Sequence, residues 1–187
     1  HGYFSVHRYL ARQRDIDLVV HLGDSIYADV ADGMVAKFIE GYPRLDPTPP
    51  ATTLDDFRLN YEQYLSDPGW RALRAAHPQV VVWDDHEFFD GFAGGVQRGD
   101  PRAFAGRVAF AEYMPVDVPD DAAVGLDRII PWGRDLRLAI QDARWYATPG
   151  DRWGDLQRAH LRPWDGRRTI VCSPVSYTHL TLPTILL

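Results

Sequence analysis

Two short, largely apolar runs stand out along the chain, and each ends abruptly in polar side chains. The first run, residues 18–22, leads into Gly23 and Asp24. The second, residues 80–83, leads directly into the four polar residues 84–87. Apolar runs of this length are typical of strands buried in parallel α/β sheets, where ligands bind beyond the carboxyl ends of the strands. The pattern therefore predicts two neighbouring strands with a binding site at their polar ends.

Helices are expected over much of the remaining chain. The spacing of apolar residues and the placement of prolines predict helices over residues 4–14, 54–65, 70–76 and 101–114. Thr53 is a residue type that caps helix N-termini, and the step Asp67-Pro68 is placed to end the second helix.

The connecting and C-terminal segments are predicted to be loops and strands. The proline-rich stretch 43–53 cannot form a regular helix or a central strand, so we expect a connector near the site. Residues 91–95 predict a flexible loop directly beyond the second polar cluster. Residues 128–130 and 136–140 predict a strand pair, because the second segment alternates apolar and polar side chains. Residues 169–173 predict a further core strand.

The composition fits a single globular domain. The chain has 187 residues, of which 45% are apolar and 12% aromatic. Its net charge of −6 argues against a nucleic-acid-binding module. The longest apolar runs fall far short of the roughly 20 residues that a membrane span needs, and no targeting signal is visible. The single cysteine, Cys172, excludes an internal disulfide, and we expect it to be buried and inert.

The polar ends of the two apolar runs carry donors that suit a metal ion. Carboxylate oxygens bind hard cations, imidazole binds zinc or iron, and the phenol of Tyr27 favours ferric iron. A carboxylate can also bridge two metals. Gly-Asp alone is often only a turn or a cap. Four polar residues directly after a buried strand are harder to explain by structure alone, so the two clusters together favour a metal site.

At these residues the chain resembles the PhoD-like (alkaline phosphatase D) family of calcineurin-like metallophosphoesterases. Gly23-Asp24-x-x-Tyr27 resembles the second metal motif, in the variant seen in purple acid phosphatases, and residues 83–87 resemble the family's version of the Gly-Asn-His-Asp/Glu motif. Further blocks extend the resemblance from residue 1 to about residue 175: residues 1–4, Arg58-x-x-Tyr61-x-x-Tyr64, Asp67-Pro68, residues 112–116 and residues 142–146.

The resemblance implies a role for each site residue. Asp24 would bridge two metals, Tyr27 would be the phenolate ligand, and Asp85 would occupy a further ligand position. His86 would contact the substrate phosphate or protonate the leaving group. Arg58 could reach a substrate phosphate, although an exposed or bracing arginine is the alternative.

The same resemblance implies a fold and an activity. The fold would be an α/β calcineurin-like sandwich of two mixed sheets flanked by helices, incomplete at both ends. The activity would be hydrolysis of small phosphate mono- or diesters by a metal-bound hydroxide. The metal pair would be Fe³⁺ with Ca²⁺, with Zn²⁺ and Mn²⁺ as alternatives, and the location extracellular or periplasmic. The oligomeric state is left open.

Some family features differ or are absent. Ser25 and Ala28 stand where a tyrosine and a glutamate are usual, and Asp90 where asparagine is common. The Cys-bearing strand expected before residue 1 and the later Gly-Asp-x-His and histidine blocks are not found. We therefore expect residues 1–174 to be part of a phosphatase domain in a longer enzyme, inactive when expressed alone. Residues 175–187 lack acids, lysine and arginine, and we expect a non-native tail there.

Two other functions remain open at this point. Gly23-Asp24-Ser25 also resembles the nucleophile block of Gly-Asp-Ser esterases, in which Ser25 would attack an ester. That reaction needs a histidine base paired with an acid, and no histidine here follows an aspartate by three residues. The chain could also be a non-catalytic remnant of the phosphatase. Outside the metal set, we expect His21 to be structural, Asp84 to point away from Asp85, and Ser25 and Asp29 to make only local hydrogen bonds.

Overall fold

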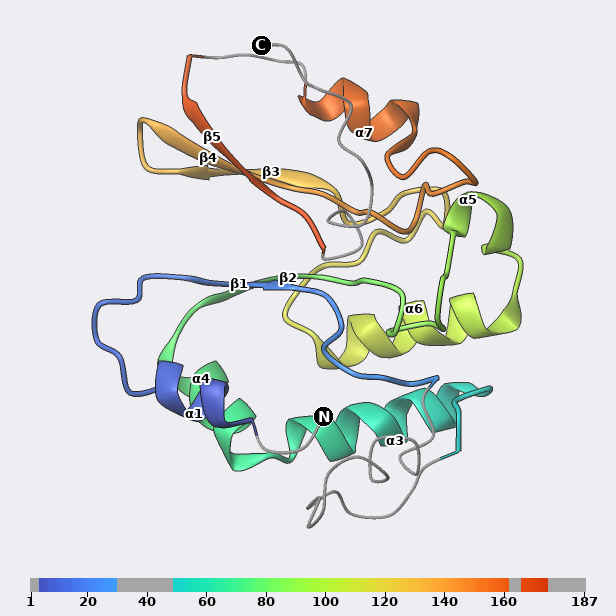
Figure 1. The fold of residues 1–187 in the computed structure, drawn as a ribbon, viewed down its shortest axis with the longest axis horizontal. Coiled ribbons are helices and arrows are strands. Elements are labelled where there is room, and N and C mark those ends of the chain that lie inside the picture. The colour runs from blue at the N-terminus through green and yellow to red at the C-terminus, as the bar shows by residue number, and fades with distance from the viewer. Residues whose placement is uncertain (1–3, 30–48, 162–165, 175–187) are drawn as a thin grey trace.

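The computed structural model describes residues 4–29, 49–161 and 166–174. Within these ranges the chain forms two small sheets and a set of helices (Figure 1). The two-stranded sheet lies between a layer of four helices, α1, α3, α4 and α6, and the three-stranded sheet; helix α7 lies on the far side of the latter. The architecture is therefore mixed α/β, with sheets in the middle and helices outside.

The two-stranded sheet is formed by the two apolar runs. Strand β1 (Val19–Leu22) pairs in parallel with β2 (Gln79–Val82), and the register runs from Val19 opposite Gln79 to Leu22 opposite Val82. The prediction that these runs are neighbouring strands is confirmed. Because the strands are parallel, their carboxyl ends meet at one edge of the sheet.

The second sheet has the strand order β3-β4-β5. Strand β3 (Arg128–Trp132) pairs antiparallel with β4 (Leu136–Ile140), which pairs in parallel with β5 (Arg168–Cys172). The three predicted strands are confirmed, with β3 extending through Pro131. The expectation that the last of them is a core strand is wrong, because Ile170 and Val171 of β5 are about half exposed and only Cys172 is buried. Pro131 is tolerated because β3 lies at the edge of the described sheet, where a missing N–H breaks no inner ladder.

The first helical layer is formed by four segments, of which all but α1 begin directly after a residue whose side chain caps the helix. Its members are α1 (Ser5–Leu10), α3 (Leu54–Leu65), α4 (Pro68–Ala76) and α6 (Pro101–Tyr113). Thr53 caps α3 as predicted: its side chain accepts the N–H of Asp56, whose carboxylate accepts the N–H of Thr53 in return. Helix α1 is shorter than the predicted 4–14.

The prediction of a flexible loop over residues 91–95 is wrong for its last two residues, which are helical. Gly94 begins the short helix α5 (Gly94–Gln97), and its N–H donates to the carbonyl oxygen of Arg144 at 2.8 Å. A Cβ at Gly94 would collide with the backbone of Trp145, so glycine here serves close packing rather than flexibility. Helix α7 (Gly154–Leu161) was not predicted. Residues 43–48 of the predicted connector lie outside the described residues.

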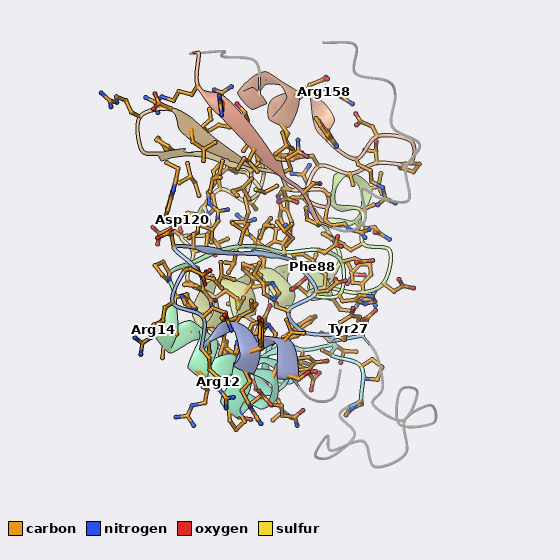
Figure 2. All side chains as sticks on the ribbon, turned by 60° about the vertical axis from the view of Figure 1, so that its left-hand side comes forward. Arg12, Arg14, Tyr27, Phe88, Asp120 and Arg158 are labelled. Atoms are coloured by element: carbon orange, nitrogen blue, oxygen red, sulfur yellow. The ribbon has the colours of Figure 1, made fainter. Side chains whose placement is uncertain are left out.

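Aromatic side chains fill the core beneath the polar end of β2. The Trp83 ring lies 5.3 Å from those of Phe88 and Trp145 and 5.2 Å from that of Phe110, measured between ring centroids. Side chains occupy the space between the layers (Figure 2). Cys172 is buried, as predicted. Among the described helices, none has the length and apolar character to cross a membrane.

Candidate metal centre

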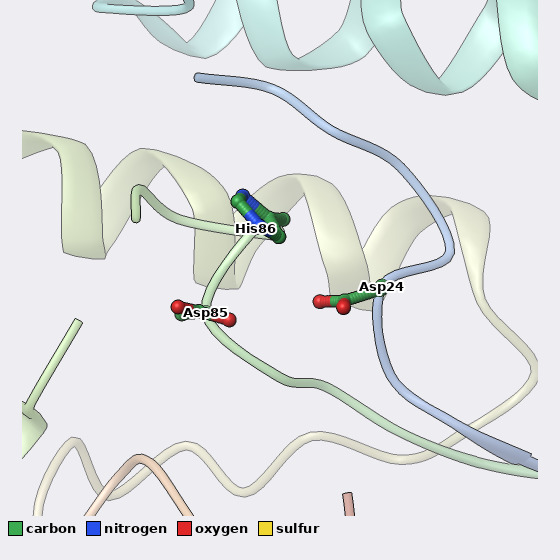
Figure 3. Close-up of side chains that lie close together, drawn as sticks. All are labelled: Asp24, Asp85 and His86. Atoms are coloured by element: carbon green, nitrogen blue, oxygen red, sulfur yellow. The ribbon is translucent and has the colours of Figure 1, made fainter. Parts of the chain in front are cut away.

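Three predicted site residues converge at the carboxyl edge of the β1–β2 sheet. Asp24 follows β1, whereas Asp85 and His86 follow β2, and their side chains face a shared space (Figure 3). One ligand atom from each residue lies within 4.8 Å of the other two. Strands β1 and β2 lie far apart in the sequence, since β1 ends at Leu22 and β2 begins at Gln79. Their parallel pairing brings together the three residues that the sequence predicted to lie close to one another.

The backbone at Gly23 and Asp24 turns sharply to present the Asp24 carboxylate. Both residues have positive φ, +81° and +52°. A Cβ on Gly23 would lie 2.5 Å from the Cβ of Asp84, so only glycine allows the two strand ends to approach this closely. Asp24 Oδ1 is buried and has no hydrogen-bond partner among the described residues. Asp24 Oδ2 accepts a long hydrogen bond, 3.4 Å, from the hydroxyl of Tyr27.

Asp85 and its neighbour Asp84 share a buried arginine. Arg144 Nε donates to Asp84 Oδ1 at 2.5 Å, and Arg144 Nη2 lies 3.0 Å from Asp85 Oδ1. Asp85 Oδ2 accepts the N–H of Gly91 at 2.8 Å. A carboxylate offers about four acceptor positions, so Asp85 is fixed in place and can still bind a cation. Asp84 therefore pairs with Arg144, in agreement with the expectation that it binds a partner other than the metal, but it does so together with Asp85 rather than pointing away from it.

His86 is held by an aspartate from the other strand end. Its Nδ1 lies 2.8 Å from Asp29 Oδ1, and the second oxygen of Asp29 accepts the N–H of Asp90 at 2.6 Å. The Tyr27 ring lies against the imidazole with centroids 4.2 Å apart. The sequence predicted only local bonds for Asp29, whereas this one spans 57 residues.

The acidic groups at this edge strongly affect one another. Burial raises the pKa of Asp24 to about 6, and the charge of Asp84 adds to the effect. Burial also raises the pKa of Tyr27, again with the Asp24 charge. For His86, burial opposes the charged form, but the hydrogen bond to Asp29 and the nearby acids raise its pKa to about 9. A cation placed here would relieve this crowding of negative charge.

Glu87 is an acidic residue of this cluster for which the sequence predicted no role. It is fully buried, and its carboxylate accepts hydrogen bonds from Asp24, Ser25 and Asp84. Burial raises its pKa to about 7, while these hydrogen bonds act in the opposite direction. Together with Asp29 and Arg144, it supports the predicted ligands through contacts between residues far apart in the sequence.

The donor set fits a hard divalent or trivalent cation. It combines two carboxylates, a phenol and an imidazole, and one oxygen of Asp24 is buried without a partner among the described residues. Buried polar atoms in folded proteins nearly always have a partner. An orphaned carboxylate oxygen, on a residue that converges with two other potential ligands, is thus the observation that points to a metal.

Arg58 is placed differently from the other predicted site residues. It lies on α3, where its guanidinium forms two hydrogen bonds with Glu112 of α6, at 2.6 and 2.7 Å, and one with Asp55 at 3.2 Å. These contacts agree with the bracing alternative. His21 is also structural in character, since its ring lies 5.0 Å from that of Trp70 and 6.2 Å from that of His7.

The fold and this cluster define an α/β protein with a candidate metal centre at the carboxyl ends of adjacent parallel strands. The sequence model of the PhoD-like phosphatase family matches residues 1–172, and the chain belongs to that family. It is 33% identical over 156 residues to alkaline phosphatase D of Bacillus subtilis strain 168. That alignment covers 78% of this chain and 26% of the relative, so the chain spans about a quarter of the relative's length.

A solved structure of PhoD agrees with this assignment. It superposes with a TM-score of 0.64 at 31% sequence identity, covering 78% of this chain and 29% of the solved one. The mixed α/β arrangement described above is therefore shared with PhoD over most of the chain.

Proposed function

We propose that this chain provides part of the bimetallic centre of a phosphoesterase that hydrolyses small phosphate mono- or diesters. The observation that carries the proposal is the convergence of Asp24, Asp85 and His86, of which Asp24 has a carboxylate oxygen without a partner among the described residues. Membership of the PhoD-like phosphatase family supports phosphate esters as the substrate class. The calcineurin-like sandwich is the finer fold that we propose, with residues 1–174 as part of it.

Each residue is proposed to have one role at the metals. Asp24 would hold both ions, because its Oδ1 has no partner among the described residues and its Oδ2 accepts only one long hydrogen bond. Tyr27 supplies a phenolate oxygen, and Asp85 binds through lone pairs not used by Arg144 and Gly91. Hard oxygen donors of this kind favour Fe³⁺ with Ca²⁺, and Zn²⁺ or Mn²⁺ are the alternatives. Further ligands come from outside this set.

A bound metal pair supplies Lewis acidity, which polarises a phosphoryl oxygen and activates water as a nucleophile. The residues of this chain supply the remaining chemistry. Asp29 bonds Nδ1 of His86 and so orients the ring. Nε2 is then the nitrogen that meets the substrate phosphate or gives its proton to the leaving oxygen. Arg58 would need to leave its ion pairs with Glu112 to take part.

The test is an Asp24→Asn substitution in the gene product that carries this segment. A neutral amide bridges two cations poorly, so we expect loss of bound metal and loss of p-nitrophenyl phosphate hydrolysis. Asp155→Asn is the matched control, because Asp155 is fully exposed and bonds only Arg158 among the described residues. Metal analysis by mass spectrometry and a phosphatase assay decide it. Full metal content with retained turnover would show that Asp24 is not a metal ligand.

The metal identity has its own spectroscopic signature. A ferric ion bound by the Tyr27 phenolate produces a charge-transfer band in the visible range, which Tyr27→Phe should abolish. We also propose that the 187-residue chain alone binds metal weakly and is inactive, because the residues gathered here are too few to fill two coordination shells. Stoichiometric iron and turnover in this chain would contradict that proposal.

A further inference from the structure

Glu87 is not among the residues whose ligand atoms converge, yet it contacts both strand ends that carry them. Its Oε1 accepts the N–H and the hydroxyl of Ser25 at 2.6 and 2.5 Å. Its Oε2 accepts the N–H of Asp24 at 3.1 Å and that of Asp84 at 2.8 Å. One fully buried carboxylate therefore receives three backbone N–H groups and one hydroxyl.

These bonds continue the connection between the strands where the ladder ends. The register of β1 and β2 stops at Leu22 and Val82. Beyond that point the chain turns through two residues of positive φ, and Asp24 is the non-glycine one. A side chain makes the left-handed region unfavourable, so such a residue persists only where its surroundings hold it. The bond from the Asp24 N–H to Glu87 is the contact that does so.

The partners of Glu87 distinguish it from an ordinary buried ion pair. Arg144 is bonded to Asp84 and Asp85, and within the described residues no cationic side chain forms a salt bridge with Glu87. Both Glu87 oxygens are instead used to fix main-chain N–H groups. The carboxylate thus determines where the backbone of Asp24 lies relative to that of β2.

We propose that Glu87 is the positioning residue of the metal centre: it fixes the left-handed backbone of Asp24 and so sets the distance between the Asp24 and Asp85 carboxylates before metal binds. This inference rests on the proposed metal-binding function. It predicts that Glu87 affects metal affinity without contacting the metal, because a preformed site avoids the cost of ordering its ligands on binding.

The experiment uses the gene product that carries this segment as the wild-type protein and compares its Mn²⁺ binding with that of Glu87→Gln and of two controls. The amide of glutamine places a donor against main-chain donors, so Asp24 loses its anchor, and we expect Mn²⁺ affinity per folded molecule to fall at least about tenfold, ~1.4 kcal/mol. Glu112→Gln removes a half-exposed glutamate that pairs with Arg58. Asp142→Asn removes a buried carboxylate that also accepts backbone N–H groups but touches none of the converging residues' side chains. Both controls should keep wild-type affinity in their folded fraction.

Amide hydrogen exchange of the metal-free wild-type protein tests the same idea without any substitution. The N–H groups of Asp24, Ser25 and Asp84 should already be protected, as strongly as those within β1. Protection that develops only when Mn²⁺ is added would overturn the proposal, as would unchanged Mn²⁺ affinity in Glu87→Gln. If the wild-type protein binds no Mn²⁺, Fe³⁺ or Ca²⁺, the proposed function itself fails, whatever the variants do.

Discussion

Asp142 and Asp24 both present buried carboxylate oxygens, but the two differ in how many donors they meet. Asp142 Oδ1 accepts the N–H groups of Arg144 and Trp145, and Oδ2 accepts Trp83 Nε1 and the N–H of Leu126, all between 2.7 and 3.0 Å. Asp24 has one long bond on Oδ2 and none on Oδ1 within the described residues. A buried aspartate can therefore have all its oxygens hydrogen-bonded in a structural role, or it can keep an oxygen available to bind a metal.

The environment of each carboxylate agrees with that distinction. Asp142 joins the loop before β3 to the segment after β4, and its partners are all donors. Asp24 lies among acids, and the nearby Asp84 charge contributes to its raised pKa. Satisfying the lone pairs of Asp142 stabilises the fold, whereas those of Asp24 remain available to a ligand.

The comparison predicts that the same substitution destabilises the metal-free protein strongly at Asp142 and hardly at all at Asp24. Asp142→Asn places an NH₂ group against donors and leaves N–H groups unsatisfied, so we expect a loss of about 3 kcal/mol in the free energy of unfolding. Asp24→Asn relieves repulsion between acids and should change that free energy by less than about 1 kcal/mol. Urea denaturation after metal chelation measures both. Equal destabilisation by the two variants would contradict the distinction.

His21 sharpens the comparison, because its Nδ1 is also buried without a partner among the described residues. It lies against aromatic rings rather than acids, and burial together with the charge of His7 lowers its pKa from 6.5 to about 4. The unfolded chain therefore binds more protons between these pH values, and stability falls as the pH drops from 6.5 toward 4.

We expect this effect of His21 to amount to about 3 kcal/mol. His21→Phe should remove most of that acid sensitivity and leave metal content unchanged, because an unpartnered atom marks a metal site only where other ligands face it. Unfolding free energies at several pH values, with metal analysis, test both statements. Loss of metal in His21→Phe would show that His21 contributes to metal binding as well.

The sequence predicted the local parts of this arrangement better than the long-range ones. The apolar runs predicted β1 and β2, and the polar residues after them indicated Asp24, Asp85 and His86. These features could be predicted because strand ends and ligand residue types are visible in short stretches of sequence. Contacts made by Asp29, Glu87 and Arg144 depend on which segments pack together, and no local pattern shows them. For the same reason the tight packing of Gly94 was taken for loop flexibility.

Asp29 tests how far an open coordination site depends on such long-range support. Asp29→Asn keeps the side-chain size but weakens the bond to His86 Nδ1, so we expect turnover to fall about 10- to 100-fold with metal bound by Asp24 and Asp85 largely retained. Asp90→Asn is the control, since only the backbone N–H of Asp90 contacts Asp29 in the described residues. Steady-state kinetics with metal analysis distinguish the two. Unchanged turnover would show that His86 needs no partner.

The smallest expected effect belongs to Ser25, whose hydroxyl donates to Glu87 at 2.5 Å rather than to a histidine. Ser25→Ala removes one of the four bonds to that carboxylate and leaves the three backbone bonds in place. Turnover of p-nitrophenyl phosphate should therefore stay within about threefold of wild type, since a neutral hydrogen bond contributes roughly 1 kcal/mol or less. An esterase that used Ser25 as its nucleophile would lose all activity instead. Assays of the variant with a phosphate ester and a carboxylic ester, side by side, separate the two mechanisms, and complete loss on either substrate would favour the nucleophile.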